Sequence, residues 1–193
     1  MYPLTTQPPD GGPTDAALVG AARRGEPWAQ EALFRRYAAR ANALALRLLG
    51  RETEVDDVVQ DAFIEALDGL HRLSRPEAFS AWLSGIVVRK VYRVLRRHAL
   101  WSRLGFRRLS DSDFEALVSP MAPPDVALEL RELYGIVASM APELRVPLLL
   151  RRVEGLTLEE IAESVGCSLA TAKRRLAAAQ VAFEQATTSK EHS

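Results

Sequence analysis

Cysteine is nearly absent from this chain of 193 residues, in which Cys167 stands alone. A single cysteine forms no internal disulfide and supplies no cluster of thiolate ligands for zinc, so neither kind of scaffold is expected. This composition fits a reducing compartment, and we expect a cytoplasmic protein. We interpret Cys167 as a small buried residue, because a redox sensor would need an exposed thiol with a low pKa.

Net charge and long hydrophobic runs are also missing. Lysine plus arginine and aspartate plus glutamate number 25 each, so total charge gives no argument for binding to nucleic acid or a membrane. Charged residues interrupt every apolar run before it reaches the roughly 20 residues needed to cross a bilayer. Residues 1–13 lack the basic start and apolar centre of a signal peptide and are rich in proline, glycine and threonine, so we expect a disordered tail.

Alternating strand patterns do not occur in the first half of the chain, where apolar side chains recur at steps of three and four. This spacing predicts an all-helical domain over residues 14–98. Its helices are expected to begin near Asp15, Pro27, Thr53 and Pro76. Thr53 is expected to cap the third helix, with Asp56 three positions later in a capping-box-like arrangement.

Residues 99–125 lose the helical periodicity and gather glycine, serine and proline, which predicts a flexible linker. Helical spacing returns over residues 126–186, and residues 187–193 are predicted to be a second disordered tail. The expected fold is all-α, with two small helical domains joined by a flexible linker. Pro147 lies inside a predicted helix that starts at Pro142, and since proline there costs about 3 kcal/mol, we expect a kink or a broken first turn.

Residues 157–179 have the spacing of a helix-turn-helix. Thr157 and Glu160 form a capping box that starts a short helix, and Gly166 ends it. After a three-residue turn, the hydroxyl of Ser168 can cap a second helix. In such a motif the second helix commonly enters the major groove of DNA.

Candidate DNA contacts lie near the start of that second helix. The polar side chains off its buried stripe are Thr171, Lys173, Arg174 and Arg175. Arginine can donate two hydrogen bonds to a guanine edge, whereas lysine and a helix N-terminus suit phosphate. The alternative is an ordinary pair of surface helices with a solvated basic face, but the capping box, turn and basic helix occur together and favour the DNA-binding motif.

The charges that cancel overall are segregated along the chain. Residues 89–108 contain eight basic residues and no acid, and the aromatic Trp82, Tyr92 and Trp101 lie in or beside this segment. Aromatic rings can stack on unpaired bases, so we favour a nucleic-acid surface over the alternative of a solvated basic face. The third predicted helix is acidic instead, which indicates a protein partner on that side.

Catalytic and metal-binding patterns are missing from the sequence. His71, His98 and His192 are scattered, Cys167 has no partner at a useful spacing, and no glycine-rich phosphate loop or metal-ligand cluster occurs. We therefore expect no enzymatic activity, no cofactor and no metal site.

Three stretches resemble a known family. VDDVVQDAFIEAL (Val55–Leu67) and FSAWLSGIVVRKVYRVLRR (Phe79–Arg97) resemble the second conserved region of the extracytoplasmic-function (ECF) sigma factors, which direct bacterial RNA polymerase to promoters and help to open them. Residues 140–179 resemble the fourth region of the same family. The resemblance covers nearly all of the chain after residue 13 and implies a region 2 domain over residues 14–98 and a region 4 domain over residues 126–186.

The resemblance also implies roles and partners. The core-polymerase surface, which would dock on the clamp helices of the largest subunit, consists of Asp56, Asp57, Gln60, Asp61 and Glu65. The minus-ten surface, which would engage that promoter element and hold its non-template strand open, consists of Trp82, Arg89, Arg93, Arg96 and Arg97. The minus-thirty-five surface, which would read duplex DNA, consists of Ser168, Thr171, Lys173, Arg174 and Arg175. The flap of the second-largest polymerase subunit and an anti-sigma factor are further expected partners.

Two positions depart from the family pattern. Arg89 and Arg93 stand where the family usually has an asparagine and an aspartate. Cations there should strengthen contact with phosphate and remove any specific bonds that the usual residues make to bases. We therefore expect the chain to open DNA, but we infer no particular minus-ten sequence. The alternative function is a helix-turn-helix regulator that acts without polymerase; the sequence shows neither a dimerising heptad after Ala179 nor a ligand-pocket signature to support it.

Overall fold

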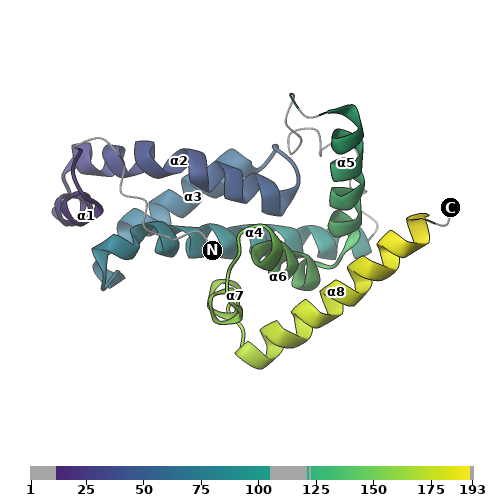
Figure 1. Ribbon diagram of the computed structural model, residues 1–193. Helices are drawn as coiled ribbons and strands as arrows, with labels where there is room; N and C mark the ends of the chain where they lie inside the picture. Colours follow the sequence, from purple (N-terminus) through teal and green to yellow (C-terminus); the bar gives the residue numbers. More distant parts are fainter. Residues whose placement is uncertain (1–11, 105–120, 122, 192–193) are drawn as a thin grey trace.

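The computed structural model describes residues 12–104, 121 and 123–191, which form eight α-helices (Figure 1). The N-terminal half contains α1 (Asp15–Arg23), α2 (Pro27–Leu49), α3 (Val55–Asp68) and α4 (Phe79–Arg103). Two short 3-10 turns, η1 (Leu70–Arg72) and η2 (Pro76–Ala78), connect α3 to α4. The C-terminal half contains α5 (Pro124–Ser139), α6 (Pro142–Arg152), α7 (Leu158–Val165) and α8 (Leu169–Glu191). No strand occurs in the described residues, and the predicted all-α fold is confirmed.

The N-terminal half packs α2, α3 and α4 against one another, with α1 beside the start of α2 (Figure 1). Side chains that are at most 1% exposed fill the space between these helices and include Leu18, Leu33, Leu48, Ala62, Phe79 and Ile86. Burial of one large apolar side chain contributes about 1.5 to 3 kcal/mol. Packing of the apolar stripes therefore holds these helices in place and fixes which sides of α3 and α4 face outward.

The start of α3 differs from the prediction. Glu54 is the N-cap residue, without a capping hydrogen bond from its side chain, and the predicted cap Thr53 is exposed, so that prediction is wrong. The Glu54 carboxylate pairs with Arg51 and lies 3.2 Å from His98 Nε2 on α4. The residue at this helix end thus contacts a distant element, which the local sequence does not indicate.

In the C-terminal half, α8 packs along α6 and also contacts α5 and α7. α6 runs unbroken through Pro147, so the predicted break in its first turn is wrong. Pro147 is buried with Val146 and Leu148, and this apolar packing offsets the hydrogen bond that the proline removes. α8 extends to Glu191, through most of the segment predicted to be a C-terminal tail.

The two halves pack against each other. α4 contacts α6 and α7, α2 contacts α6, and buried residues of both halves join one apolar cluster. α4 continues through residues 99–103 of the predicted linker, and α5 begins at Pro124. Residues 105–120 and 122 of that linker lie outside the described residues. The boundaries of the two domains stay a prediction, but their helices share an interface.

The helix-turn-helix forms from the predicted local signals. Thr157 Oγ1 accepts a hydrogen bond from the Glu160 amide (3.2 Å), and Glu160 Oε2 accepts one from the Thr157 amide (2.8 Å), which confirms the capping box at the start of α7. α7 ends at Gly166, whose φ of 69° lies in the left-handed region that favours glycine. Ser168 Oγ accepts a hydrogen bond from the Thr171 amide at 3.2 Å, so the predicted cap of α8 is also confirmed.

Replacing Thr157 with alanine should lower the free energy of unfolding by about 1 kcal/mol, because the substitution removes one side of the capping box. Thr53→Ala is the matched control, since Thr53 is exposed and caps nothing at the start of α3. The control should change stability by less than about 0.5 kcal/mol. Chemical denaturation followed by circular dichroism measures both variants, and equal losses would contradict the assignment of the cap.

Candidate nucleic-acid and partner-protein interfaces

The acidic helix α3 and the basic helix α4 lie side by side (Figure 1). Lys90 Nζ is 3.0 Å from Glu65 and 3.7 Å from Asp61, and Arg93 is 3.6 Å from Glu65. Asp61 and Arg93 keep 68% and 66% of their side-chain surface exposed. An ion pair between exposed groups, such as that of Arg93 with Glu65, contributes at most about 1 kcal/mol, so an outside partner can replace it at low cost.

The residues of the core-polymerase surface are all exposed on α3. Asp56 and Asp57 lie in the first turn, where the helix dipole favours negative charge. Partial burial acts to raise the pKa of Glu65, but the hydrogen bond from Lys90 and the positive charges nearby outweigh it and hold that pKa below its usual value. This surface is therefore anionic at neutral pH, and a groove of about 560 Å³ runs between it and α4.

The minus-ten surface divides into exposed cations and a partly buried aromatic. The exposed members are Arg93, Arg96 and Arg97. Arg89 is half-buried, and Trp82 packs against Phe79 with the ring centroids 6.1 Å apart. The exposed guanidinium groups are accessible to phosphate, whereas part of the Trp82 ring belongs to the core.

Tyr92 is more buried than expected for a residue that stacks on bases. It is 9% exposed, and Arg96 lies over its ring at 5.9 Å from the centroid. Burial raises the pKa of Tyr92, and the charge of Arg175 on α8 opposes that rise, so Tyr92 faces the C-terminal half. In this arrangement it is a packing residue, whereas Trp101 is 48% exposed and stays a candidate for stacking.

The minus-thirty-five surface lies at the start of α8. Lys173 and Arg174 are exposed there, whereas Arg175 is half-buried near the interface with α4. The hydroxyls of Ser168 and Thr171 hydrogen-bond to each other at 2.9 Å within the helix cap. Two accessible cations beside a helix N-terminus suit a DNA backbone and the base edges next to it.

Buried charges meet between the two halves, and no local sequence pattern indicated them. Arg51 follows α2, Arg145 lies on α6, and each is 5% exposed. The Nε atoms of both have no hydrogen-bond partner among the described residues. Burial, and then the nearby charge of Arg51, lowers the pKa of Arg145 to about 10. Arg51 also contacts Glu54 and His98, so the unfavourable charge is concentrated on Arg145.

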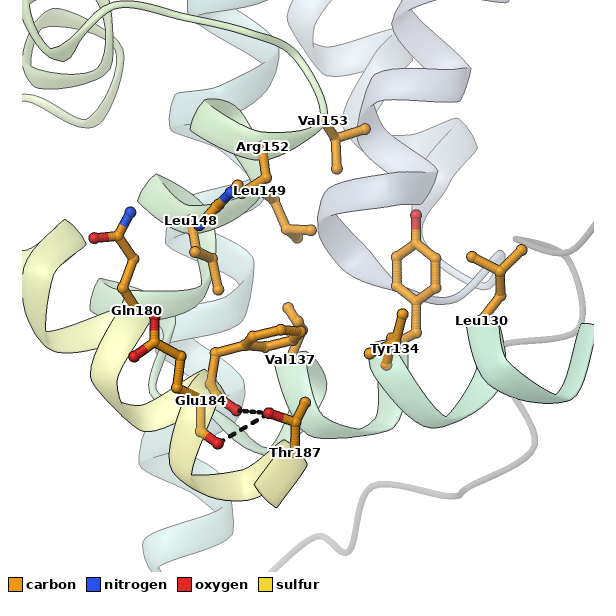
Figure 2. Close-up of a pocket in the computed structure, with 12 residues that line it drawn as sticks. Leu130, Tyr134, Val137, Leu148, Leu149, Arg152, Val153, Gln180, Glu184 and Thr187 are labelled. Carbon is orange, nitrogen blue, oxygen red and sulfur yellow. Dashed lines mark hydrogen bonds between the residues drawn. The ribbon is translucent and has the colours of Figure 1, made fainter. Parts of the chain in front are cut away.

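A largely apolar pocket of about 450 Å³ opens between α5, α6 and α8 (Figure 2). Tyr134 and Val137 of α5 and Phe183 of α8 line it, together with Arg152 and Glu184. The α5 residues recur at helical spacing, a pattern that predicts core packing but does not reveal that the core is left partly open. A hollow of this kind suits an apolar side chain from a partner protein.

Other kinds of site were searched for over the same residues. Within the described ranges, no group of three or more histidine, cysteine, aspartate or glutamate side chains is arranged to hold a metal ion. In that part of the chain, no helix combines the length and apolar character needed to span a membrane. Cys167 is a free, half-buried thiol in the turn of the helix-turn-helix. The candidate sites are therefore the charged surfaces of α3, α4 and α8 and the pocket.

Two family models match the chain: sigma-70 region 2 over residues 33–100 and sigma-70 region 4 over residues 130–179. The chain is similar to the ECF RNA polymerase sigma-E factor of Escherichia coli strain K12, with 29% identity over 185 residues that cover 89% of this chain and 93% of that protein. It is also similar to the RNA polymerase sigma-H factor of Pseudomonas aeruginosa, with 28% identity over 186 residues and the same coverage.

Two solved structures are similar to the chain. CnrH in complex with the cytosolic domain of CnrY is 28% identical, with a TM-score of 0.60 over 91% of this chain and 97% of that chain. The sigma factor RpoE of Bartonella quintana in complex with the anti-sigma factor NepR is 19% identical, with a TM-score of 0.61 over 82% of this chain and 96% of that chain, and supports the fold alone. Sigma factors are transcription initiation factors and not enzymes. The two matched regions and these relatives together show that the chain belongs to the sigma-70 family, as an RNA polymerase-binding sigma factor of the ECF group.

Proposed function

We propose that this sigma factor uses three separate surfaces to bring RNA polymerase to promoters: α3 for the polymerase core, α4 for the minus-ten element and α8 for the minus-thirty-five element. The observation that carries the proposal is the segregation of exposed charge, with carboxylates on α3 and cations on α4 and at the start of α8. Surfaces of opposite sign suit a basic protein partner and DNA. The protein would act where bacterial polymerase acts, in the cytoplasm.

The core-polymerase surface would dock on the clamp helices of the largest subunit. The exposed row of acids on α3 supports this docking. Asp61, for example, makes only a long ion pair of 3.7 Å among the described residues and can exchange it for a basic side chain of the polymerase. The pocket between α5, α6 and α8 would receive an apolar helix from the flap of the second-largest subunit, in the helix-in-groove mode. Two contacts far apart on the chain would hold the sigma factor on the core.

We also propose an anti-sigma factor as a partner. CnrH is described in complex with the cytosolic domain of CnrY, and RpoE with the anti-sigma factor NepR. In this chain the exposed acids of α3 and cations of α4 offer a partner of mixed charge a place to bind. Such a partner would compete with the polymerase core for the same side chains.

Asp61→Lys should weaken binding to core polymerase by about tenfold, because a charge reversal replaces attraction by repulsion at a basic partner surface. Asp68→Lys makes the same charge change on the same exposed helix, outside the core-polymerase surface, and should leave affinity unchanged. Binding to purified core polymerase and run-off transcription on genomic promoter fragments measure both. The proposed function fails if the unaltered protein neither binds the core nor starts transcripts at fixed sites.

Arg93→Asp should lower the fraction of open promoter complexes by about tenfold, because a charge-assisted contact to phosphate contributes about 1.5 to 3 kcal/mol. Arg93 is exposed and its pair with Glu65 is weak, so the change should leave the fold intact. Arg40→Asp, at an exposed position of α2, is the matched control. Permanganate reactivity of the melted strand reports the open complex. Equal reactivity with both variants would contradict the role of Arg93 in DNA opening.

Arg174→Ala should reduce discrimination between correct and altered minus-thirty-five sequences by about 1 to 3 kcal/mol, as expected for an arginine that bonds a base edge. Gln185→Ala, an exposed change farther along α8, should have no effect. Competition between promoter duplexes for holoenzyme measures the discrimination. A uniform loss of affinity for every sequence would instead make Arg174 a phosphate contact.

A further inference from the structure

Two arginine side chains are buried where α6 packs against α2. Arg51 lies between α2 and α3, Arg145 lies on α6, and each keeps only 5% of its surface exposed. Arginine is almost never buried to this extent unless its charge is paired, because removal of a cation from water is strongly unfavourable. This pair of side chains therefore requires negative charge close by.

Two carboxylates occur in this part of the molecule, and each is already paired. Glu54 lies 2.5 Å from Nη2 of Arg51. Glu154 contacts both Nε and Nη2 of Arg47 on α2, at 2.7 and 2.6 Å. Burial, and then the charge of Arg51, lowers the pKa of Arg145 to about 10, and no carboxylate of the described residues opposes that shift. Arg145 therefore stays charged at neutral pH without an acid from those residues to balance it.

The hydrogen-bond donors of the two arginines are also unsatisfied. The Nε–H groups of Arg51 and Arg145 are both buried, and neither has an acceptor among the described residues. A buried donor without an acceptor loses the hydrogen bond that water supplies in the unfolded chain. A trapped water would accept hydrogen bonds from these groups, but it carries no charge and would leave the repulsion between the two cations in place. An anion would both accept the hydrogen bonds and balance the charge.

A guanidinium group is well suited to bind an oxyanion. Its N–H groups form a planar fork that matches the oxygens of phosphate, sulfate or a carboxylate, and hydrogen bonds between charged groups are about twice as strong as neutral ones. Contacts with Glu54 and with His98 on α4 hold the Arg51 side chain in place. Arg145 is fixed by burial beside Val146 on α6. Both donors are therefore ordered before a ligand binds, which reduces the entropy lost on binding.

We propose that Arg51 and Arg145 form a binding site for a small oxyanion of the phosphate class, between α6 and the end of α2. The anion would accept a hydrogen bond from each Nε–H group and balance the two positive charges. A tetrahedral dianion suits the site better than a carboxylate, because it carries more negative charge and offers oxygens in more directions. The site contains no residue of the core-polymerase, minus-ten or minus-thirty-five surface and goes beyond the proposed function.

Titration of the full chain with inorganic phosphate tests the site directly. In protein labelled with nitrogen-15 arginine, the Nε–H signals of Arg51 and Arg145 should shift together and saturate with one midpoint as phosphate replaces chloride at constant ionic strength. The signal of Arg40, at an exposed position of α2, should shift gradually and without saturation, as screening of a surface charge does. If the two buried signals do not shift, or follow Arg40, the site does not exist.

Arg145→Met should lower the affinity for phosphate by about tenfold, read from the Nε–H signal of Arg51, because it removes a hydrogen bond between charged groups. Arg40→Met makes the same change on the exposed side of α2 and should leave the affinity unchanged. Arg145→Lys keeps the cation and loses the planar fork, so its affinity should lie between those of the unaltered protein and Arg145→Met. Equal affinity in all three variants would contradict the role of Arg145.

Thermal unfolding provides a second measurement. A ligand that binds only the native state raises the melting temperature, but phosphate also stabilises proteins in general because it is excluded from their surfaces. The rise caused by phosphate should therefore be larger in the unaltered protein and in Arg40→Met than in Arg145→Met. An equal rise in all three proteins would show exclusion alone and overturn the site.

Competition between anions identifies the ligand class. Sulfate, a tetrahedral dianion, should displace phosphate from Arg51 and Arg145, whereas acetate should compete at least tenfold more weakly because it carries one charge and two oxygens. If acetate competes as well as sulfate, the phosphate class is wrong. These measurements need neither polymerase nor DNA, so a chain that fails to bind phosphate still keeps the proposed function if run-off transcription succeeds, and the reverse result is equally distinct.

Discussion

Burial of α4 on two sides is the constraint on which the rest of the structure depends. One side, which includes Phe79, packs within the N-terminal half, and a second, which includes Tyr92, packs toward the C-terminal half. Arg93, Arg96 and Arg97 of the minus-ten surface stay exposed on the same helix. A helix used in this way positions the proposed minus-ten surface and, at the same time, contacts the helix-turn-helix through α7.

Weak ion pairs let α3 and α4 lie side by side while their charged side chains remain available to partners. A run of arginines on one helix repels itself, and the acids of α3 relieve that repulsion at distances of 3.0 to 3.7 Å. Because most of these groups face solvent, the pairs are weak and can be exchanged for polymerase or phosphate. The same side chains can therefore stabilise the free protein and bind its partners.

Much of the fold and of the candidate surfaces could be predicted because the signals are local. The capping box at Thr157, the glycine stop at Gly166 and the cap at Ser168 involve partners within a few residues, and all three are confirmed. The expected cap at Thr53 and the expected break in the first turn before Pro147 were wrong, where tertiary contacts override local preference. Glu54, the N-cap of α3, lies 3.2 Å from His98 of α4, and apolar residues around Pro147 bury that part of α6.

The interface between the halves could not be predicted, since its partners come from distant parts of the chain. Tyr92 lies off the stripe that α4 presents to its own half, so periodicity alone leaves it exposed, and side chains of the C-terminal half, including Glu143 and Arg175, lie near it. Arg145 is less predictable still, because no propensity favours an unpaired buried cation. A core rarely contains such a group, because a buried charge without full compensation is unfavourable. Its burial therefore follows from the packing of α6 against α2 and α4 and not from any local preference of the chain.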